Sequence, residues 1–448
     1  MHIRVTLKIL GLLLMLFSLT LVPPILISIG YEDQTHGAFL NAFFITLLTG
    51  FIVWLPFASH RKILRTRDGF VVVVLFWSVL ALFGSLPFYL FGQDSIPWKF
   101  VDALFESVSG LTTTGATIIP HIDDLPPGIL YYRQQLQWIG GMGIVVLAIA
   151  VLPMLGIGGM QLYRAEIPGP LKDSKLTPRI TETAKQLWYI YLTLTVICAL
   201  LYWLAGMTMF DAICHSFATI AIGGFSTHNA SLGYFDSPII EAIAVVFMLL
   251  ATINFALHFY AWRRRTINHY WHDEELRFFF TIVSTICLIT LITLMLTNPY
   301  PPLDNLRHSI FEVVSIATTT GFATDDFSSW PIMLPFVLFT AAFIGGCAGS
   351  TAGGIKAVRV LIMLKQGLRE IQRLIHPNAI IQLKLGNRPI PDRVVEAIWG
   401  FFSVYTLVFV VLMVVLLATG LDQLTAYSAV GATLNNLGPG LGDVAIHY

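Results

Sequence analysis

The stretch "GLTTTGAT" at residues 110–117 is the strongest indication of the fold in this sequence. It is a polar run of threonine and glycine between two long apolar segments, and a near copy, "IATTTGFAT", lies at 316–324. Polar, non-helical backbone is tolerated at membrane depth only where protein or a water-filled cavity surrounds it. The rest of the chain therefore has to supply such surroundings.

The composition is that of a membrane protein. Of the 448 residues, 56% are hydrophobic and 12% are charged, whereas soluble domains carry about 25% charged residues. Many apolar runs are close to the roughly 20 residues that a membrane helix needs, and no alternation of period two indicates a membrane barrel. The net charge is zero, so the chain as a whole lacks the excess of positive charge that is typical of nucleic-acid-binding proteins. Four widely spaced cysteines in apolar sequence are predicted to be buried small side chains rather than disulfide or metal ligands: Cys198, Cys214, Cys287 and Cys347.

The apolar segments predict a polytopic all-α protein. The first segment is longer than the apolar region of a signal peptide and lacks a small-residue cleavage motif, so we interpret it as a membrane helix. Four further apolar pieces are too short to span and are candidates for re-entrant segments, at 102–113, 211–222, 308–318 and 424–434. The predicted spans lie near 9–30, 38–57, 69–92, 135–156, 187–207, 238–260, 276–297, 331–346, 355–375 and 394–419, of which 355–375 is the least apolar.

Lysine and arginine cluster in alternate loops. The clusters lie at 60–68, 163–185, 262–277 and 364–393, and the other loops are nearly free of them apart from Lys99, Arg133 and Arg307. The positive-inside rule therefore predicts that these clusters and the N-terminus are cytoplasmic. All four short segments then enter the membrane from the outside.

One unit occurs four times along the chain. Its copies are "DALFESVSGLTTTGAT" (102–117), "DAICHSFATIAIGGFST" (211–227), "HSIFEVVSIATTTGFAT" (308–324) and "TAYSAVGATLNNLGPG" (425–440). A glycine follows the first residue of each copy by thirteen positions: Gly115, Gly224, Gly321 and Gly438. The unit is a span, a short half-helix, a polar glycine turn and a second span.

Such a unit is suited to a cation pore. Asp102 and Asp211 are predicted N-caps of their half-helices, and each half-helix directs the negative end of its dipole at the polar turn. Glycine permits an extended turn whose carbonyl groups face one axis, so four turns would form rings of carbonyl oxygens that replace a hydration shell. The turns contain no acidic residue, which favours a monovalent over a divalent cation.

Together these motifs resemble a known family. The glycine turns, "QWIGGMGIVVLAIAVLPMLGIGGMQLYRAEIPGP" and "FIGGCAGSTAGGIK" are similar to the TrkH/TrkG potassium-uptake subunits of the Trk/Ktr/HKT superfamily, over residues 1–448. The resemblance implies a homodimer in the lipid bilayer of the bacterial inner membrane, with a cytoplasmic RCK-type nucleotide-binding partner (TrkA-like). It also implies potassium passage down its gradient or coupled to another ion, and the choice between channel and symporter stays open.

The resemblance assigns the potassium-binding carbonyl groups by position. Glycine in all four turns matches the potassium-preferring pattern of the family. The implied filter residues are Thr113, Thr114, Gly115, Ile222, Gly223, Gly224, Thr319, Thr320, Gly321, Asn436, Leu437 and Gly438.

The implied architecture is two N-terminal helices followed by four fused M1–pore helix–M2 repeats around one pore. The chain stops at "GDVAIHY", before the family's final M2 helix, so we expect the last repeat to be incomplete. The expected divisions are an N-terminal two-helix unit at 1–60 and pore repeats at 61–165, 166–265, 266–378 and 379–448.

A small-residue stretch at 345–354, "GGCAGSTAGG", interrupts an apolar segment. Beside Lys356 it is faintly like a phosphate loop, but it follows a membrane helix rather than a strand and lacks the Gly-Lys-Ser/Thr order. Close helix packing through small residues is one alternative. We favour an intramembrane gate below the filter, as the family resemblance implies, formed by Gly345, Gly346, Gly349, Ser350, Thr351, Gly353 and Gly354.

Three ionisable residues occupy one position in the first three half-helices: Glu106, His215 and Glu312. Ionisable groups at membrane depth are functional candidates, but hydrogen bonding behind the filter is an equal alternative. The arginines at 263–265 are interpreted as topology and headgroup anchors, whereas the basic loop at 364–393 is also a candidate surface for the cytoplasmic partner.

Potassium transport is the leading functional prediction. The alternative is a secondary carrier for another cation or small solute, although four repeats of one orientation argue against the inverted repeats typical of carriers. An enzyme would need a nucleophile–base pair or a metal-binding set. Neither is visible, so no catalytic residue and no organic cofactor is predicted.

Overall fold

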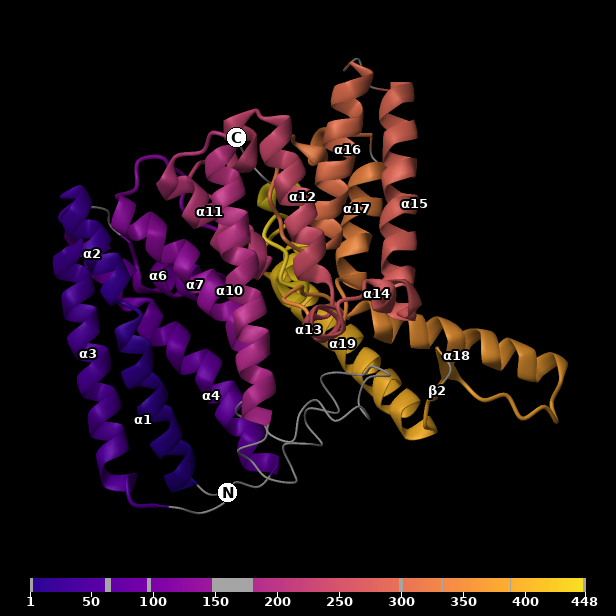
Figure 1. Ribbon diagram of the computed structural model, residues 1–448, viewed down its shortest axis with the longest axis horizontal. Helices are drawn as coiled ribbons and strands as arrows, with labels where there is room; N and C mark the ends of the chain where they lie inside the picture. Colours follow the sequence, from indigo (N-terminus) through magenta and orange to yellow (C-terminus); the bar gives the residue numbers. More distant parts are fainter. Residues whose placement is uncertain are drawn as a thin grey trace. The chain divides into compact units, whose positions relative to one another are not determined.

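The computed structural model describes residues 3–60, 66–94, 98–146, 180–297, 301–331, 333–386 and 388–445. Within these ranges the regular structure is helical apart from one pair of two-residue strands. The chain forms two compact units, one made of described residues up to Phe235 and the other of described residues from Asp236 onward. We describe each unit by itself, as unit 1 and unit 2 (Figure 1).

Unit 1 is a bundle in which α1 and α3 lie side by side (Figure 1). A Cβ atom on Gly11 of α1 would lie 2.7 Å from the Gly50 carbonyl oxygen of α3, so glycine allows the two backbones to approach closely. The rings of Phe39 and Phe88 pack against Tyr132 in the core, with centroids 5.4 and 5.1 Å away. The helices of unit 1 are α1 (Ile3–Leu19), α2 (Val22–Tyr31), α3 (His36–Trp54), η1 (Leu55–Phe57), α4 (Thr66–Gly84), α5 (Leu86–Asp94), α6 (Phe100–Leu111), α7 (Pro127–Val146), α10 (Ile180–Leu204), α11 (Met209–Ala221) and η4 (Ser231–Phe235).

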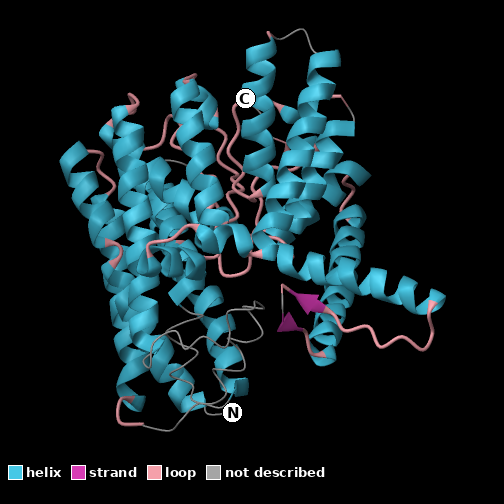
Figure 2. Cartoon of the chain, turned by 45° about the vertical axis from the view of Figure 1, so that its right-hand side comes forward, coloured by secondary structure: helices cyan, strands magenta, loops and turns pink. Residues whose placement is uncertain are grey.

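Unit 2 contains the remaining helices and the strand pair. In the antiparallel hairpin, Lys384 is opposite Pro389 and Leu385 is opposite Arg388, and Figure 2 shows these strands in magenta. The elements of unit 2 are α12 (Pro238–Thr252), α13 (Phe255–Arg264), α14 (Asn268–His272), α15 (Glu274–Thr297), α16 (Pro302–Ala317), η5 (Phe327–Ser329), α17 (Met333–Ile344), α18 (Ala357–Ile375), β1 (Lys384–Leu385), β2 (Arg388–Pro389), α19 (Asp392–Ala418), α20 (Gln423–Asn435) and η6 (Gly442–Val444).

The described residues confirm an all-α multi-pass membrane protein. Six segments are long and apolar enough to cross a membrane, or seven if one bent pair is counted as a span. Their surface is apolar because lipid replaces water around them; α19 has none of its most apolar window buried inside the protein. The six segments are Ile3–Tyr31, His36–Phe57, Asp68–Gly92, Lys185–Leu204, Glu274–Thr297 and Asp392–Ala418.

The segment predicted as one span at 238–260 is not a straight helix. It forms α12 and α13, which meet at an angle of 93°. The Asn254 side chain accepts a hydrogen bond from the Ala256 amide at 2.8 Å and caps α13, so a new helix begins at the break.

The predicted N-caps of two half-helices are also wrong by three residues. Lys99 and Thr208 occupy the N-cap positions of α6 and α11, and Asp102 and Asp211 lie in the first helical turn. There Asp102 accepts a hydrogen bond from the Lys99 amide at 2.9 Å. Each acidic residue still complements the positive end of its helix dipole.

Two arginines that we assigned to loops lie in helices. Arg133 is fully buried in α7. Arg307 lies in α16, where its Nε is 2.6 Å from a Glu241 carboxylate oxygen of α12. Two of the three exceptions to the charge pattern, Arg133 and Arg307, are therefore paired structural residues in helices.

Candidate ion-coordination site

Each of the four half-helices α6, α11, α16 and α20 ends in the same pair of backbone hydrogen bonds. In α6, the Thr114 amide donates to the Ser109 carbonyl at 2.9 Å and the Thr113 amide to the Gly110 carbonyl at 3.0 Å. This is the Schellman arrangement of a helix C-terminus. The equivalent bonds of the other three are Gly223 to Ala218 at 2.8 Å, Ile222 to Thr219 at 3.2 Å, Thr320 to Ser315 at 2.8 Å, Thr319 to Ile316 at 2.9 Å, Leu437 to Ala432 at 2.8 Å and Asn436 to Thr433 at 3.4 Å.

The segments that follow also share a backbone conformation. We name them turn 1 (112–117), turn 2 (222–227), turn 3 (318–324) and turn 4 (436–441). The residue two positions before the aligned glycine is left-handed in every turn: Thr113 (φ 60°), Ile222 (φ 55°), Thr319 (φ 66°) and Asn436 (φ 52°). Gly115, Gly224 and Gly321 are left-handed as well, with φ of 80°, 77° and 83°, whereas Gly438 is not. The repeat seen in the sequence therefore extends to the backbone.

Each unit brings two of the four turns together. In unit 1, a Cβ atom on Gly115 would clash with the Gly223 carbonyl oxygen, so turns 1 and 2 are in contact. In unit 2, a Cβ atom on Gly321 would lie 2.7 Å from Pro439 Cδ and 3.2 Å from the Gly438 amide nitrogen, so turns 3 and 4 are in contact. The twelve residues assigned to the filter lie in these two pairs of turns.

Serine side chains of the half-helices hold the turns from behind. Ser109 donates to the Ala116 carbonyl at 2.5 Å and Ser315 to the Phe322 carbonyl at 2.6 Å, the same contact in turns 1 and 3. In α20, Ser428 donates to the Leu441 carbonyl at 2.7 Å. The carbonyl groups after the glycines of turns 1 and 3 are thus directed back toward their helices.

Glu106, His215 and Glu312 have the hydrogen-bonding role that was one of the two alternatives. All three are fully buried. Both Glu106 carboxylate oxygens accept from Thr117 Oγ1 at 3.1 Å, and His215 Nε2 lies 2.9 Å from Ser226 Oγ. The carboxylate of Glu312 accepts from the Thr324 amide at 2.7 Å and the Asp325 amide at 3.2 Å. Each side chain therefore fixes the end of its own turn.

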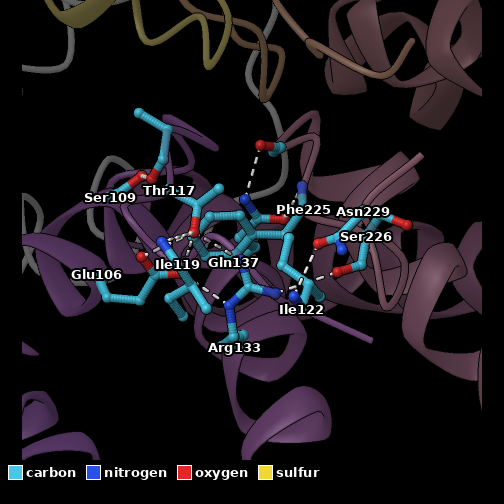
Figure 3. Close-up of polar contacts among 12 residues, drawn as sticks. Glu106, Ser109, Thr117, Ile119, Ile122, Arg133, Gln137, Phe225, Ser226 and Asn229 are labelled. Atoms are coloured by element: carbon cyan, nitrogen blue, oxygen red, sulfur yellow. Dashed lines mark hydrogen bonds and ion pairs between the residues drawn. The ribbon is translucent and has the colours of Figure 1, made fainter. Parts of the chain in front are cut away.

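Two residues of α7 that the sequence analysis missed hold turns 1 and 2 (Figure 3). Arg133 Nε lies 2.7 Å from Glu106 Oε1, and its Nη1 donates to the Ser226 carbonyl at 3.1 Å. The guanidinium carbon lies 4.3 Å from the centre of the Phe225 ring, a cation–π contact. The buried ion pair therefore joins the half-helix of turn 1 to the end of turn 2.

Gln137 lies one helical turn beyond Arg133. Its Nε2 donates to the Gly223 carbonyl at 2.6 Å, and its Oε1 accepts from the Phe225 amide at 3.1 Å (Figure 3). One lone pair of the Gly223 carbonyl oxygen therefore accepts a hydrogen bond from the Gln137 side chain. The available signal was the four-residue spacing of Arg133, just before the predicted span 135–156, and Gln137 within it. In a continuous helix this spacing places both side chains on one face.

The stretch 345–354 is non-helical and joins α17 to α18, as the gate interpretation requires. It contacts turn 3 and the end of α20. The Gly353 amide donates to Thr319 Oγ1 at 2.7 Å, and the Gly354 amide donates to the Asn435 carbonyl at 3.0 Å, at the end of α20. A Cβ atom on Gly353 would clash with that carbonyl oxygen, so only glycine allows this approach.

A histidine lies in a charged cluster on the loop after turn 2. His228 Nδ1 is 2.8 Å from Asp123 Oδ1, and its Nε2 is 3.5 Å from Asp211 Oδ1. Its ring stacks on Tyr234 with centroids 3.5 Å apart. Partial burial opposes protonation, but the two carboxylates outweigh this effect and raise the pKa of His228 above its usual value.

The described residues contain no group of three or more His, Cys, Asp or Glu side chains arranged to hold a metal ion. Cys198, Cys214, Cys287 and Cys347 are all free thiols. Turns 1 and 3 carry backbone carbonyl and threonine hydroxyl oxygens, the kind of oxygen atom that hard cations prefer as ligands.

Comparison with known proteins gives consistent matches over the whole chain. Residues 35–448 match the TrkH family, described as cation transport protein. The chain is 61% identical over 448 residues to the Trk system potassium uptake protein TrkH of Halomonas elongata, and 54% identical over 449 residues to that of Escherichia coli K12; each match covers 100% of this chain and 92% of the relative. The crystal structure of the potassium transporter TrkH from Vibrio parahaemolyticus is similar, with a TM-score of 0.91 and 52% identity over 100% of this chain and 92% of that one.

Proposed function

The chain belongs to the TrkH family of cation transport proteins, and from this premise we propose that it takes up potassium through a filter formed by turns 1 to 4. Membership of a transport family agrees with the prediction of a transporter rather than an enzyme. Potassium is then the transported substrate, not a resident cofactor.

The observation that carries the proposal is the fourfold recurrence of one helix-to-turn motif. Every half-helix ends in the same Schellman bonds and the same left-handed residue. The negative end of each helix dipole therefore points to its turn, where it stabilises a cation. Carbonyl oxygens of the twelve assigned residues, from Thr113 to Gly438, would replace the hydration shell of potassium.

We further propose that the pair of turns in unit 1 and the pair in unit 2 line one pore. The chain would then contain two N-terminal helices and four pore-helix repeats, divided as the sequence predicts. This is supported by the equal conformation of turns 1 and 3 and by the likeness to the solved transporter over the entire chain.

The stretch 345–354 would act as the gate of this pore. Its contacts with Thr319 and with the end of α20 support this role, because the gate must lie against the turns that it closes. The basic clusters and the N-terminus would face the cytoplasm. A homodimer with a cytoplasmic RCK-type nucleotide-binding subunit completes the proposed assembly.

Cation flux into proteoliposomes tests the function directly. We expect uptake of radioactive rubidium, a potassium substitute, that excess external potassium abolishes and equal sodium reduces much less. The reconstitution includes the nucleotide-binding partner, and correct folding is verified by size-exclusion chromatography. Folded protein that moves no rubidium under these conditions, or that moves an organic solute instead, would contradict the proposal.

A further inference from the structure

Two adjacent glutamates at the start of α15, Glu274 and Glu275, bind different parts of unit 2. Glu275 is buried, with 5% of its surface exposed, and its Oε1 accepts hydrogen bonds from the Ala348 amide at 2.6 Å and the Val358 amide at 3.2 Å. The two amides lie on either side of residues 349–357. One carboxylate oxygen therefore holds the proposed gate at Ala348 and the start of α18 at Val358.

Glu274 binds the hairpin and α18 instead. Its Oε2 accepts from the Gly386 amide at 2.6 Å, between β1 and β2, and its Oε1 binds Lys365 Nζ of α18. Lys365 Nζ also donates to the Lys384 carbonyl at 2.9 Å. A displacement of the hairpin must therefore move Glu274 or break a charged contact.

The far side of the gate is held by the break between α12 and α13. The Cys347 amide donates to the Thr252 carbonyl at 3.2 Å, and the Phe255 amide donates to the Gly349 carbonyl at 3.1 Å. Beyond these contacts, Gly353 reaches Thr319 of turn 3. Residues 345–354 thus lie between Glu275 and the turns of unit 2.

We propose that Glu274 and Glu275 couple the β1–β2 hairpin to the gate, with Glu275 as the positioning residue that keeps the gate against turn 3. This inference rests on the proposed function of residues 345–354 as a gate. Because the glutamates are consecutive in the first turn of a helix, a shift of one carries the other. A buried carboxylate that loses both amide donors is strongly destabilised. When the first turn of α15 moves, residues 345–354 therefore move with Glu275. When this turn does not move, they stay against turn 3.

Cys347 provides a reporter within the gate that does not depend on transport. It is buried, with 1% of its surface exposed, so its reaction with a membrane-permeant maleimide reports opening of this stretch. The parent for the experiment is the whole protein in proteoliposomes with Cys198→Ala, Cys214→Ala and Cys287→Ala. Labelling of Cys347 and rubidium uptake are measured on the same preparations.

We expect Glu275→Ala to raise the initial labelling rate of Cys347 about tenfold, since the two hydrogen bonds from the Ala348 and Val358 amides are lost. Glu275→Gln keeps a neutral acceptor and should raise it less, about threefold. Lys365 is distant in sequence from Glu274 but binds its side chain. Lys365→Met should therefore also raise the labelling rate of Cys347. Adding Lys365→Met to Glu275→Ala should give no further increase, because both changes act on one link.

The matched control is Glu396→Ala. Glu396 is exposed on α19 and lies outside 364–393, the candidate partner surface, so labelling should stay at the parental rate. If Glu275→Ala fails to fold, Glu275→Gln and Lys365→Met decide the matter. Parental labelling rates in both of these folded variants overturn the coupling. Absence of rubidium uptake in the parent overturns the proposed function instead, and labelling still reports whether Glu275 holds this stretch.

Discussion

Arg133 and Glu106 form an ion pair in which both side chains are fully buried. Removing one partner of such a pair leaves an uncompensated buried charge and costs about 3–5 kcal/mol. We therefore expect Arg133→Met to lower the thermal unfolding midpoint in detergent markedly. Because Arg133 also donates a hydrogen bond to the Ser226 carbonyl at the end of turn 2, we expect the same substitution to weaken discrimination between potassium and sodium. Thermal melts and rubidium uptake with sodium competition measure the two effects.

Arg373→Met is the matched control for this residue. Its side chain is 43% exposed and pairs with Glu370 within α18, and exposed pairs contribute about 0–1 kcal/mol. Adding Glu106→Gln to Arg133→Met should restore part of the lost stability, since no unpaired charge remains. An unfolding midpoint of Arg133→Met equal to that of Arg373→Met would show that the buried pair does not stabilise the turns.

At the scale of one element, the half-helix and its turn depend on the aligned glycine. Gly115 has φ of 80°, a conformation that L side chains rarely adopt, and its added Cβ would meet the Gly223 carbonyl oxygen. Gly115→Ala should therefore displace turns 1 and 2 and reduce rubidium uptake at least tenfold, while the protein remains folded. Transport assays and size-exclusion chromatography together measure this outcome.

Gly400→Ala is the control for the element. Gly400 lies in α19 with no atom within 4 Å of an added Cβ, and alanine favours a helix by about 1 kcal/mol over glycine. We expect unchanged uptake and equal or higher stability. Unchanged uptake in Gly115→Ala as well would show that the conformation of turn 1 is not required for transport.

Six of the ten predicted spans are helices long and apolar enough to cross a membrane within the described residues. The predictions at 331–346 and 355–375 are wrong in this respect, because α17 has only 12 residues and α18 is not apolar enough to be a candidate span. The length and apolarity of 276–297 indicate the span that α15 forms at Glu274–Thr297, because lipid demands an apolar helix of that length. The bend at Asn254 was not predicted, since neither proline nor glycine marks it. The roles of Arg133 and Gln137 were not predicted for a related reason. They depend on which face of α7 packs against turns 1 and 2. The spacing of residues along the sequence shows that two side chains share a helix face, but not which other segment that face contacts.

At the scale of the whole molecule, each unit contributes one pair of turns with its own support. Turns 1 and 2 are held by a buried ion pair and an amide from α7. Turn 3 instead contacts the stretch 345–354 through Thr319. A filter of four turns would thus combine a pair that is also held by α7 with a pair in which turn 3 contacts the stretch 345–354.

Combining glycine substitutions tests whether the two pairs of turns line one pore. Gly321→Ala in turn 3 is the counterpart of Gly115→Ala, because Gly321 has φ of 83° and its added Cβ would lie 2.7 Å from Pro439 Cδ. In a shared pore every ion passes all four turns, so each single substitution should abolish most rubidium uptake and the double substitution should remove little more. If each unit instead conducted through its own pair of turns, each single substitution would leave about half of the uptake and only the double substitution would abolish it. Uptake measured at equal amounts of folded protein distinguishes the two arrangements, and a half-active single variant would contradict the four-turn filter.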